Sequence, residues 1–154
     1  MKVLELFEAL DSSVKYRVTR EKAQRFSTTA SVGGRDVVFD AHHDEDENFW
    51  HIEFGELVDK DTKTYSATGS GSALQVGAFV RASFEEFLQR YTPAEFEFTA
   101  ETDTRAKIYK RVVDKVAHKY SGTAHPIGAE TEFRYVLKKE KKNIDPGAFS
   151  FRLR

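Results

Sequence analysis

Cysteine is absent from the chain, which therefore forms no disulfide bond, offers no thiolate to a metal ion and has no thiol nucleophile. Charge of one sign is also missing: 24 basic and 25 acidic side chains leave a net charge of -1, so no overall field attracts nucleic acid or an anionic membrane. No uncharged run is long enough to span a bilayer, and acidic residues interrupt the apolar positions of residues 1–10, unlike a signal peptide. These absences predict a soluble protein of the cytoplasm that does not bind membranes.

Aromatic side chains, in contrast, are abundant: the 154 residues include 13 Phe and 6 Tyr. With 40% hydrophobic and 32% charged residues, the composition excludes a disordered protein and favours a core built largely on aromatic rings. A chain of this length is long enough to bury one core but too short for two comfortable ones. We therefore expect a single domain over residues 1–154.

The first part of this domain, residues 1–63, predicts a helix followed by a β-meander. Apolar residues at helical spacing predict the helix over 2–10. From residue 14 onward the apolar period is two, and Gly33-Gly34 predicts a tight turn between two antiparallel strands. The stretch 42–48 is rich in His, Asp and Glu and predicts an acidic loop before a strand at 49–54.

The middle part, residues 64–120, alternates strand and helix. A strand at 64–68 leads through a glycine-containing loop into a helix over about 72–90. A strand at 95–100 follows, and then a second helix that runs from Thr104 to about Tyr120. Strands joined through a helix favour parallel pairing with a right-handed crossover, which would splay neighbouring strands near Gly69.

The last part, residues 121–154, contains a predicted strand at 130–137 and a tail. Phe149, Phe151 and Leu153 alternate in this tail as they would in a final strand, or the tail is an arm that docks on a partner. Together the three parts predict an α+β fold. We expect a mostly antiparallel, twisted sheet of six to seven strands with two main helices.

Two short motifs carry a family resemblance. The loop Gly69-Ser70-Gly71-Ser72-Ala73 and the later Ile108-Tyr109-Lys110-Arg111 resemble the acyl-CoA-binding core of GNAT-type N-acyltransferases over residues 64–120. The resemblance implies a GNAT-like second half and acetyl-CoA as the cofactor. It also implies a cofactor site made of Gly69, Ser70, Gly71, Ser72 and Ala73. Backbone N–H groups at the start of a helix lie at the positive end of its dipole, and glycine lets a pyrophosphate approach closely.

The same resemblance implies catalytic roles. A tyrosine in the second helix of the family protonates the departing CoA thiolate, and Tyr109 occupies the matching position here. Glu53 or Glu56, on or just after the strand two before the loop, is a candidate base for an acceptor amine. The sequence thus predicts Tyr109 and Glu53 as an acid and a base.

The chain also departs from the family pattern. Ser66 stands where the family usually has Arg or Gln, Thr102 stands where it has Asn, and a meander replaces the helices that form much of the acceptor site. In outline the whole chain is similar to small proteins of tailed bacteriophages. These have an aromatic-rich meander, a Thr-Gly-x-Gly loop and a later motif like Arg105-Ala106-Lys107-Ile108-Tyr109.

One further group of residues could bind a metal ion. His42, His43, Asp44, Asp46 and His51 offer ligands that suit zinc or nickel, although adjacent strand residues point to opposite faces and an acidic hairpin tip is the simpler interpretation.

Basic residues of the second predicted helix, namely Lys107, Lys110, Arg111 and Lys115, could follow a phosphate backbone. A solvated helix face explains them as well, so nucleic acid is a less favoured partner. An exposed aromatic patch would allow a homo-oligomer.

These observations leave two functional hypotheses. The first is a non-catalytic phage-type protein whose acyltransferase-like scaffold binds a protein partner in the virion or on a host target. The alternative is an acyl-CoA-dependent N-acyltransferase acting on an amine of a protein, nucleotide or modified base. An enzyme should have an open cleft at 69–73 with free N–H groups, whereas Phe or Tyr side chains should fill that cleft in a binding protein.

Overall fold

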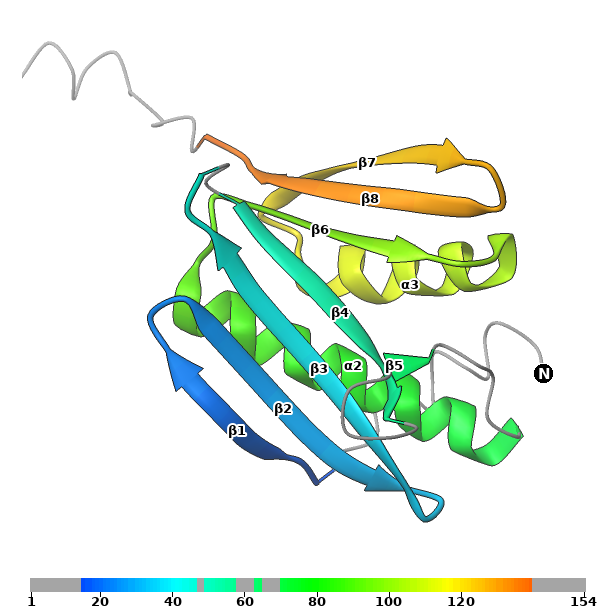
Figure 1. The fold of residues 1–154 in the computed structure, drawn as a ribbon. Coiled ribbons are helices and arrows are strands. Elements are labelled where there is room, and N and C mark those ends of the chain that lie inside the picture. The colour runs from blue at the N-terminus through cyan, green and yellow to red at the C-terminus, as the bar shows by residue number, and fades with distance from the viewer. Residues whose placement is uncertain (1–14, 47–48, 58–62, 65–69, 140–154) are drawn as a thin grey trace, which may run out of the picture.

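The computed structural model describes residues 15–46, 49–57, 63–64 and 70–139 (Figure 1). Its strands are β1 (Arg17–Lys22), β2 (Arg25–Val32), β3 (Arg35–Asp44), β4 (Phe49–Leu57), β5 (Lys63–Thr64), β6 (Glu95–Ala100), β7 (Tyr120–Ile127) and β8 (Glu130–Leu137), and its helices are α2 (Ser70–Tyr91) and α3 (Asp103–Val116). The strands form one sheet in the order β1-β2-β3-β4-β6-β8-β7, and the short β5 adds to β4. The predicted α+β class, with a mostly antiparallel sheet and two main helices, is confirmed.

The β1–β4 meander follows from its alternating pattern and its turns. Gly33 and Gly34 have φ angles of 60° and 76°, which a two-residue hairpin turn of the primed type requires, and they join β2 to β3 as predicted. The acidic loop predicted at 42–48 begins later than expected, because β3 continues to Asp44, which pairs with Phe49 of β4. His42 and His43 are therefore strand residues.

The sheet contains one parallel pair. β4 and β6 are parallel neighbours, but their register includes only two residue pairs, Trp50 with Phe96 and His51 with Glu97. Beyond this point the two strands diverge (Figure 1). The sequence predicted parallel pairing between the two strands that flank the first helix, but β6 pairs in parallel with β4, and the described residues of β5 are antiparallel to β4.

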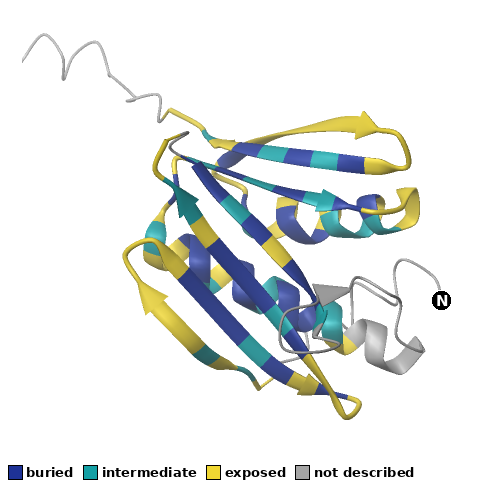
Figure 2. Ribbon diagram, viewed as in Figure 1, coloured by how far each residue is buried: buried dark blue, intermediate teal, exposed yellow. Residues whose placement is uncertain are grey.

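Both helices cover the same face of the sheet, and the core lies between the helices and the sheet (Figure 2). Phe84 of α2 is fully buried and contacts Phe39 and Phe54 from the meander as well as Phe96 and Phe98 from β6. Aromatic rings are thus the main packing units, as the composition predicted. No helix in the described residues is both long and apolar enough to cross a membrane.

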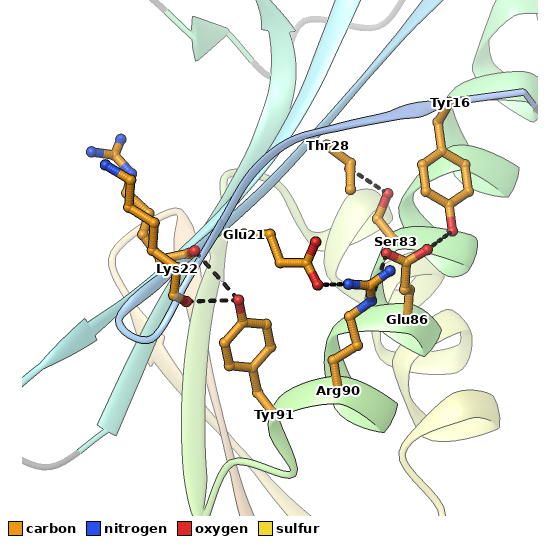
Figure 3. Close-up of polar contacts among 9 residues, drawn as sticks. Tyr16, Glu21, Lys22, Thr28, Ser83, Glu86, Arg90 and Tyr91 are labelled. Carbon is orange, nitrogen blue, oxygen red and sulfur yellow. Dashed lines mark hydrogen bonds and ion pairs between the residues drawn. The ribbon is translucent and has the colours of Figure 1, made fainter.

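Polar contacts attach β1 and β2 to α2 (Figure 3). The Tyr16 hydroxyl donates to Glu86 Oε1 at 2.7 Å, and Arg90 forms an ion pair with Glu21. The buried hydroxyls of Thr28 and Ser83 are hydrogen-bonded to each other at 2.7 Å. These contacts fix α2 across the first two strands of the meander.

The second helix differs from its prediction at its end. It begins where expected, with Thr102 as N-cap accepting from the Arg105 N–H at 3.2 Å, but it ends at Val116 and not near Tyr120. Tyr120 is buried because it opens β7, a strand that the sequence pattern did not predict. The predicted helix over 2–10, most of the predicted strand at 64–68 and the tail lie outside the described residues.

Candidate functional site

β4 is the strand at which the two parts of the sheet meet. β3 pairs along one edge of β4 from Phe49 to Glu56, and β5 and β6 share the other edge. β6 pairs at Trp50 and His51, and β5 pairs at Glu56 and Leu57. The parallel pairing of β4 with β6 therefore ends before Phe54, which is where the two strands diverge.

Tyr109 lies at this divergence. It belongs to α3, yet its ring packs edge-on against Phe54 of β4, with centroids 4.8 Å apart and ring planes at 88°. Burial raises the pKa of the Tyr109 hydroxyl, an effect that neighbouring Arg105 opposes only in part. The phenol therefore stays protonated at neutral pH and can serve as a proton donor.

Other aromatic rings fill part of the same region. Phe54 and Phe98 have centroids 5.8 Å apart, so side chains from β4 and β6 meet on the helix-covered face although their backbones diverge. Phe84 of α2 packs beneath both rings. The aromatic filling that the sequence predicts for a binding protein concerns the cleft at 69–73, and it stays a prediction.

The predicted cofactor loop is the beginning of a helix. α2 starts at Ser70, two residues earlier than predicted, so Ser70, Gly71, Ser72 and Ala73 form its first turn, and Gly69 lies outside the described residues. The first N–H groups of a helix have no partner within it and lie at the positive end of its dipole. Binding of a pyrophosphate by this first turn stays a prediction.

The position of α2 directs this first turn toward the end of β4. Tyr91, the last residue of α2, packs against Trp50 near the start of β4, while Phe84 packs against Phe54 farther along the strand. α2 therefore runs antiparallel to β4, and its N-terminus lies toward the end of β4 where β6 has diverged (Figure 1).

The two candidate bases, Glu53 and Glu56, lie on different faces of β4. Glu53 is exposed and, since neighbouring strand residues alternate between faces, it lies on the opposite face of β4 from Phe54. Glu56 forms an ion pair with Arg35 at 3.1 Å. The structure therefore does not bring Tyr109 and Glu53 together on one face, and their assignment as acid and base stays a prediction.

The histidine-rich segment forms a cluster on the sheet face opposite the helices. His51 Nδ1 lies 2.7 Å from Glu97 Oε1, and its Nε2 lies 3.5 Å from Asp44 Oδ2. His42 stacks on His51 at 5.1 Å, whereas His43 contacts Trp50 on the other face. Within the described residues no three His, Asp or Glu side chains are placed to hold a metal ion. Glu97 was missed because its proximity depends on the parallel pairing.

The basic residues of α3 lie at its surface, where Lys110 forms an ion pair with Asp114 at 2.6 Å. Lys107, Arg111 and Lys115 are exposed. Such a surface fits a solvated helix, and nucleic-acid binding through it stays a prediction.

Comparison with known proteins gives no family. No protein-family model matches the chain, and no curated protein matches it. Similar solved structures include a point mutant of the spermidine N-acetyltransferase SpeG from Vibrio cholerae, with 7% identity over 93% of this chain and 95% of that one and a TM-score of 0.44. A chimera of SpeG and hSSAT has 7% identity over 76% and 69% of the two chains and a TM-score of 0.43. These values assign no activity to this chain.

Proposed function

We propose that this protein binds an acyl-CoA where β4 and β6 diverge and transfers the acyl group to an amine. The observation that carries the proposal is Tyr109, a phenol that extends from α3 to Phe54 of β4 and is kept protonated by burial. Its ring places the phenol at the point where β4 and β6 diverge.

The described residues fit an acyl-CoA at three places. Backbone N–H groups of Ser70, Gly71 and Ser72 suit the pyrophosphate, because they lie at a helix N-terminus. Beyond His51, β4 and β6 diverge, and the pantetheine arm would lie at this divergence. Tyr109 extends from α3 to Phe54 of β4, where the sulfur-bearing end of the arm would lie.

The acyl transfer itself requires few further groups from the protein. When bound, an acyl-CoA supplies an activated thioester carbonyl, which an amine nitrogen can attack. The surrounding rings of Phe54 and Phe98 would exclude water. Tyr109 would donate its proton to the sulfur as the carbon–sulfur bond breaks. Glu53, on the opposite face of the sheet, would accept the amine's proton only if the acceptor entered from that face.

A second candidate function rests on the aromatic filling. Phe98 and Tyr109 both pack against Phe54 in the region where an enzyme would need space. This favours a non-catalytic protein that keeps the scaffold and binds a protein partner, as predicted for a phage-type protein in the virion or the host cytoplasm.

Calorimetric titration with acetyl-CoA tests the cofactor site first. We expect saturable binding to the wild type and at least tenfold weaker binding, about 1.4 kcal/mol, to Gly71→Glu, whose carboxylate would repel the pyrophosphate. Gly71→Gln is the matched control, since it adds similar bulk without charge. Neither side chain should unfold the helix, because glycine is the poorer helix former. No heat of binding at millimolar acetyl-CoA would favour the non-catalytic candidate.

An acyl-transfer assay then tests the chemistry. Free CoA thiol is released on transfer and can be measured directly, because the protein has no cysteine of its own. With a panel of amines, we expect Tyr109→Phe to lower kcat by about 100-fold, the ordinary contribution of a general acid, while acetyl-CoA binding is kept. Equal turnover by the two proteins would remove Tyr109 from the mechanism.

A further inference from the structure

The two outer edges of the sheet differ in their protection against strand pairing. β1 forms one edge and has charged side chains at four of its six positions, Arg17, Arg20, Glu21 and Lys22. Its register with β2 also shifts between Val18 and Arg20, which marks a bulge. Charges and bulges are the usual devices that keep an edge strand from pairing with another chain.

β7 forms the other edge and lacks both devices. Its eight residues include no Lys, Arg, Asp or Glu, and all seven after Tyr120 are exposed. Its register with β8 is continuous from Tyr120 to Ile127. Pro126 is the one residue that weakens the edge as a hydrogen-bonding partner, because it has no N–H. Within the described residues no strand pairs with the outer edge of β7.

Among the residues that the structure describes, the surroundings of β7 leave this edge accessible. α3 packs on β6 and β8, and the side of β7 that faces the helix layer presents the small residues Gly122, Ala124 and Pro126, all exposed. The β7–β8 hairpin also contains both large hydrophobic side chains that are exposed in the described residues, Ile127 at 58% and Val136 at 46%. An uncharged strand edge beside exposed apolar side chains is a surface suited to another strand.

We propose that β7 pairs with β7 of a second copy of this chain, in an antiparallel arrangement that joins two sheets into one. A strand without charges can face itself across a two-fold axis with no like-charge repulsion. Pairing centred on Ala124 places Ile127 opposite Ser121 of the second copy, which is itself the register partner of Val136. The exposed apolar side chains then gather on one face of the joined sheet. This inference is independent of the proposed acyl-CoA site.

Sedimentation velocity at increasing protein concentration tests the proposal, with two matched threonines. Thr123 on β7 and Thr19 on β1 are both exposed, and their hydroxyls donate weak hydrogen bonds to carbonyls of the adjacent strand, at 3.5 Å to Arg134 and 3.3 Å to Ser27. We expect a concentration-dependent dimer that Thr123→Lys weakens at least tenfold and Thr19→Lys leaves unchanged. Thermal unfolding of both variants shows that they are folded.

A cysteine variant locates the two-fold axis. Because the chain has no cysteine, Ala124→Cys introduces a single thiol, and residues directly opposite in an antiparallel pair are close enough for a disulfide. We expect a covalent dimer on mild oxidation of Ala124→Cys and none with Thr19→Cys. A wild type that is monomeric up to its solubility limit would overturn the proposal. So would a dimer that resists Thr123→Lys or that crosslinks through position 19.

Discussion

The halves of the sheet on either side of the β4–β6 pair are built differently. The β1–β4 half is an antiparallel meander fixed to α2 by polar contacts such as Tyr16 with Glu86, whereas the β6–β8 half is joined to α3 through Tyr135, whose hydroxyl donates to Asp114 at 2.7 Å. The halves meet through two parallel residue pairs and a group of aromatic rings. The contact between them is therefore made mainly by side chains, and the proposed ligand site lies where backbone pairing ends.

The largest effect should come from removing the ring that both halves share. Phe84 is fully buried and contacts aromatic rings of β3, β4 and β6, so Phe84→Ala should lower the free energy of unfolding by about 3–5 kcal/mol. Urea unfolding followed by circular dichroism measures this loss. A change below about 1 kcal/mol would show that the halves are held together by other contacts.

A smaller effect should come from one half alone. Ser83→Ala leaves the buried Thr28 hydroxyl without its partner, which should destabilise the protein by about 1–3 kcal/mol. Thr28→Val with Ser83→Ala removes both hydroxyls, so the double variant should be more stable than the sum of the single changes predicts. Additive losses in the four-protein cycle would mean that the two hydroxyls do not interact.

The pH dependence of stability should involve a tyrosine of each half. Burial raises the pKa of Tyr16 to about 12, with Glu86 adding to the effect, and burial alone raises that of Tyr120 to about 12. Below pH 10 both phenols are protonated in the folded and the unfolded states. Between pH 10 and 12 only the unfolded state loses these protons, so the free energy of unfolding falls as pH rises.

Urea titrations from pH 9 to 12 measure this fall, and Tyr16→Phe and Tyr120→Phe should each make it shallower than in the wild type. Because Tyr16 is near the surface, solvent should make its contribution the smaller of the two. A wild-type slope retained in Tyr120→Phe would contradict the raised pKa of Tyr120.

The smallest effect should come from the ion pairs at the surface of the first half. Arg90 pairs with Glu21 and with Glu86, but its side chain is 40% exposed, so Arg90→Ala should change stability by no more than about 1 kcal/mol. Repeating the measurement at high salt should reduce the difference further. A loss as large as that of Phe84→Ala would mean that polar contacts dominate this half.

The sequence predicted those elements whose side chains alternate between core and solvent. β2, β3, β4 and β8 have this pattern, and all were predicted. β7 was missed because only Tyr120 is buried, so its remaining residues have no apolar period. Periodicity therefore detects a strand only where a core lies on one of its faces.

The candidate site was predictable in its parts but not in its assembly. Tyr109 and the first turn of α2 were predicted as site residues from short local motifs. Their relation to β4 depends on which strands pair in parallel, which no local pattern determines. The position of Glu53, in contrast, follows from a local pattern. The alternation of side chains along β4 places Glu53 on the face opposite to that of Phe54.

Backbone amide chemical shifts of the protein during titration with acetyl-CoA test the central claim most directly. The account predicts that the largest changes occur at residues 70–72, in the first turn of α2, and at residues 52–55, where β4 has diverged from β6. The amides of β1 and β7 should not change. Spectra that stay the same at millimolar acetyl-CoA, or changes confined to strands away from the β4–β6 divergence, would contradict it.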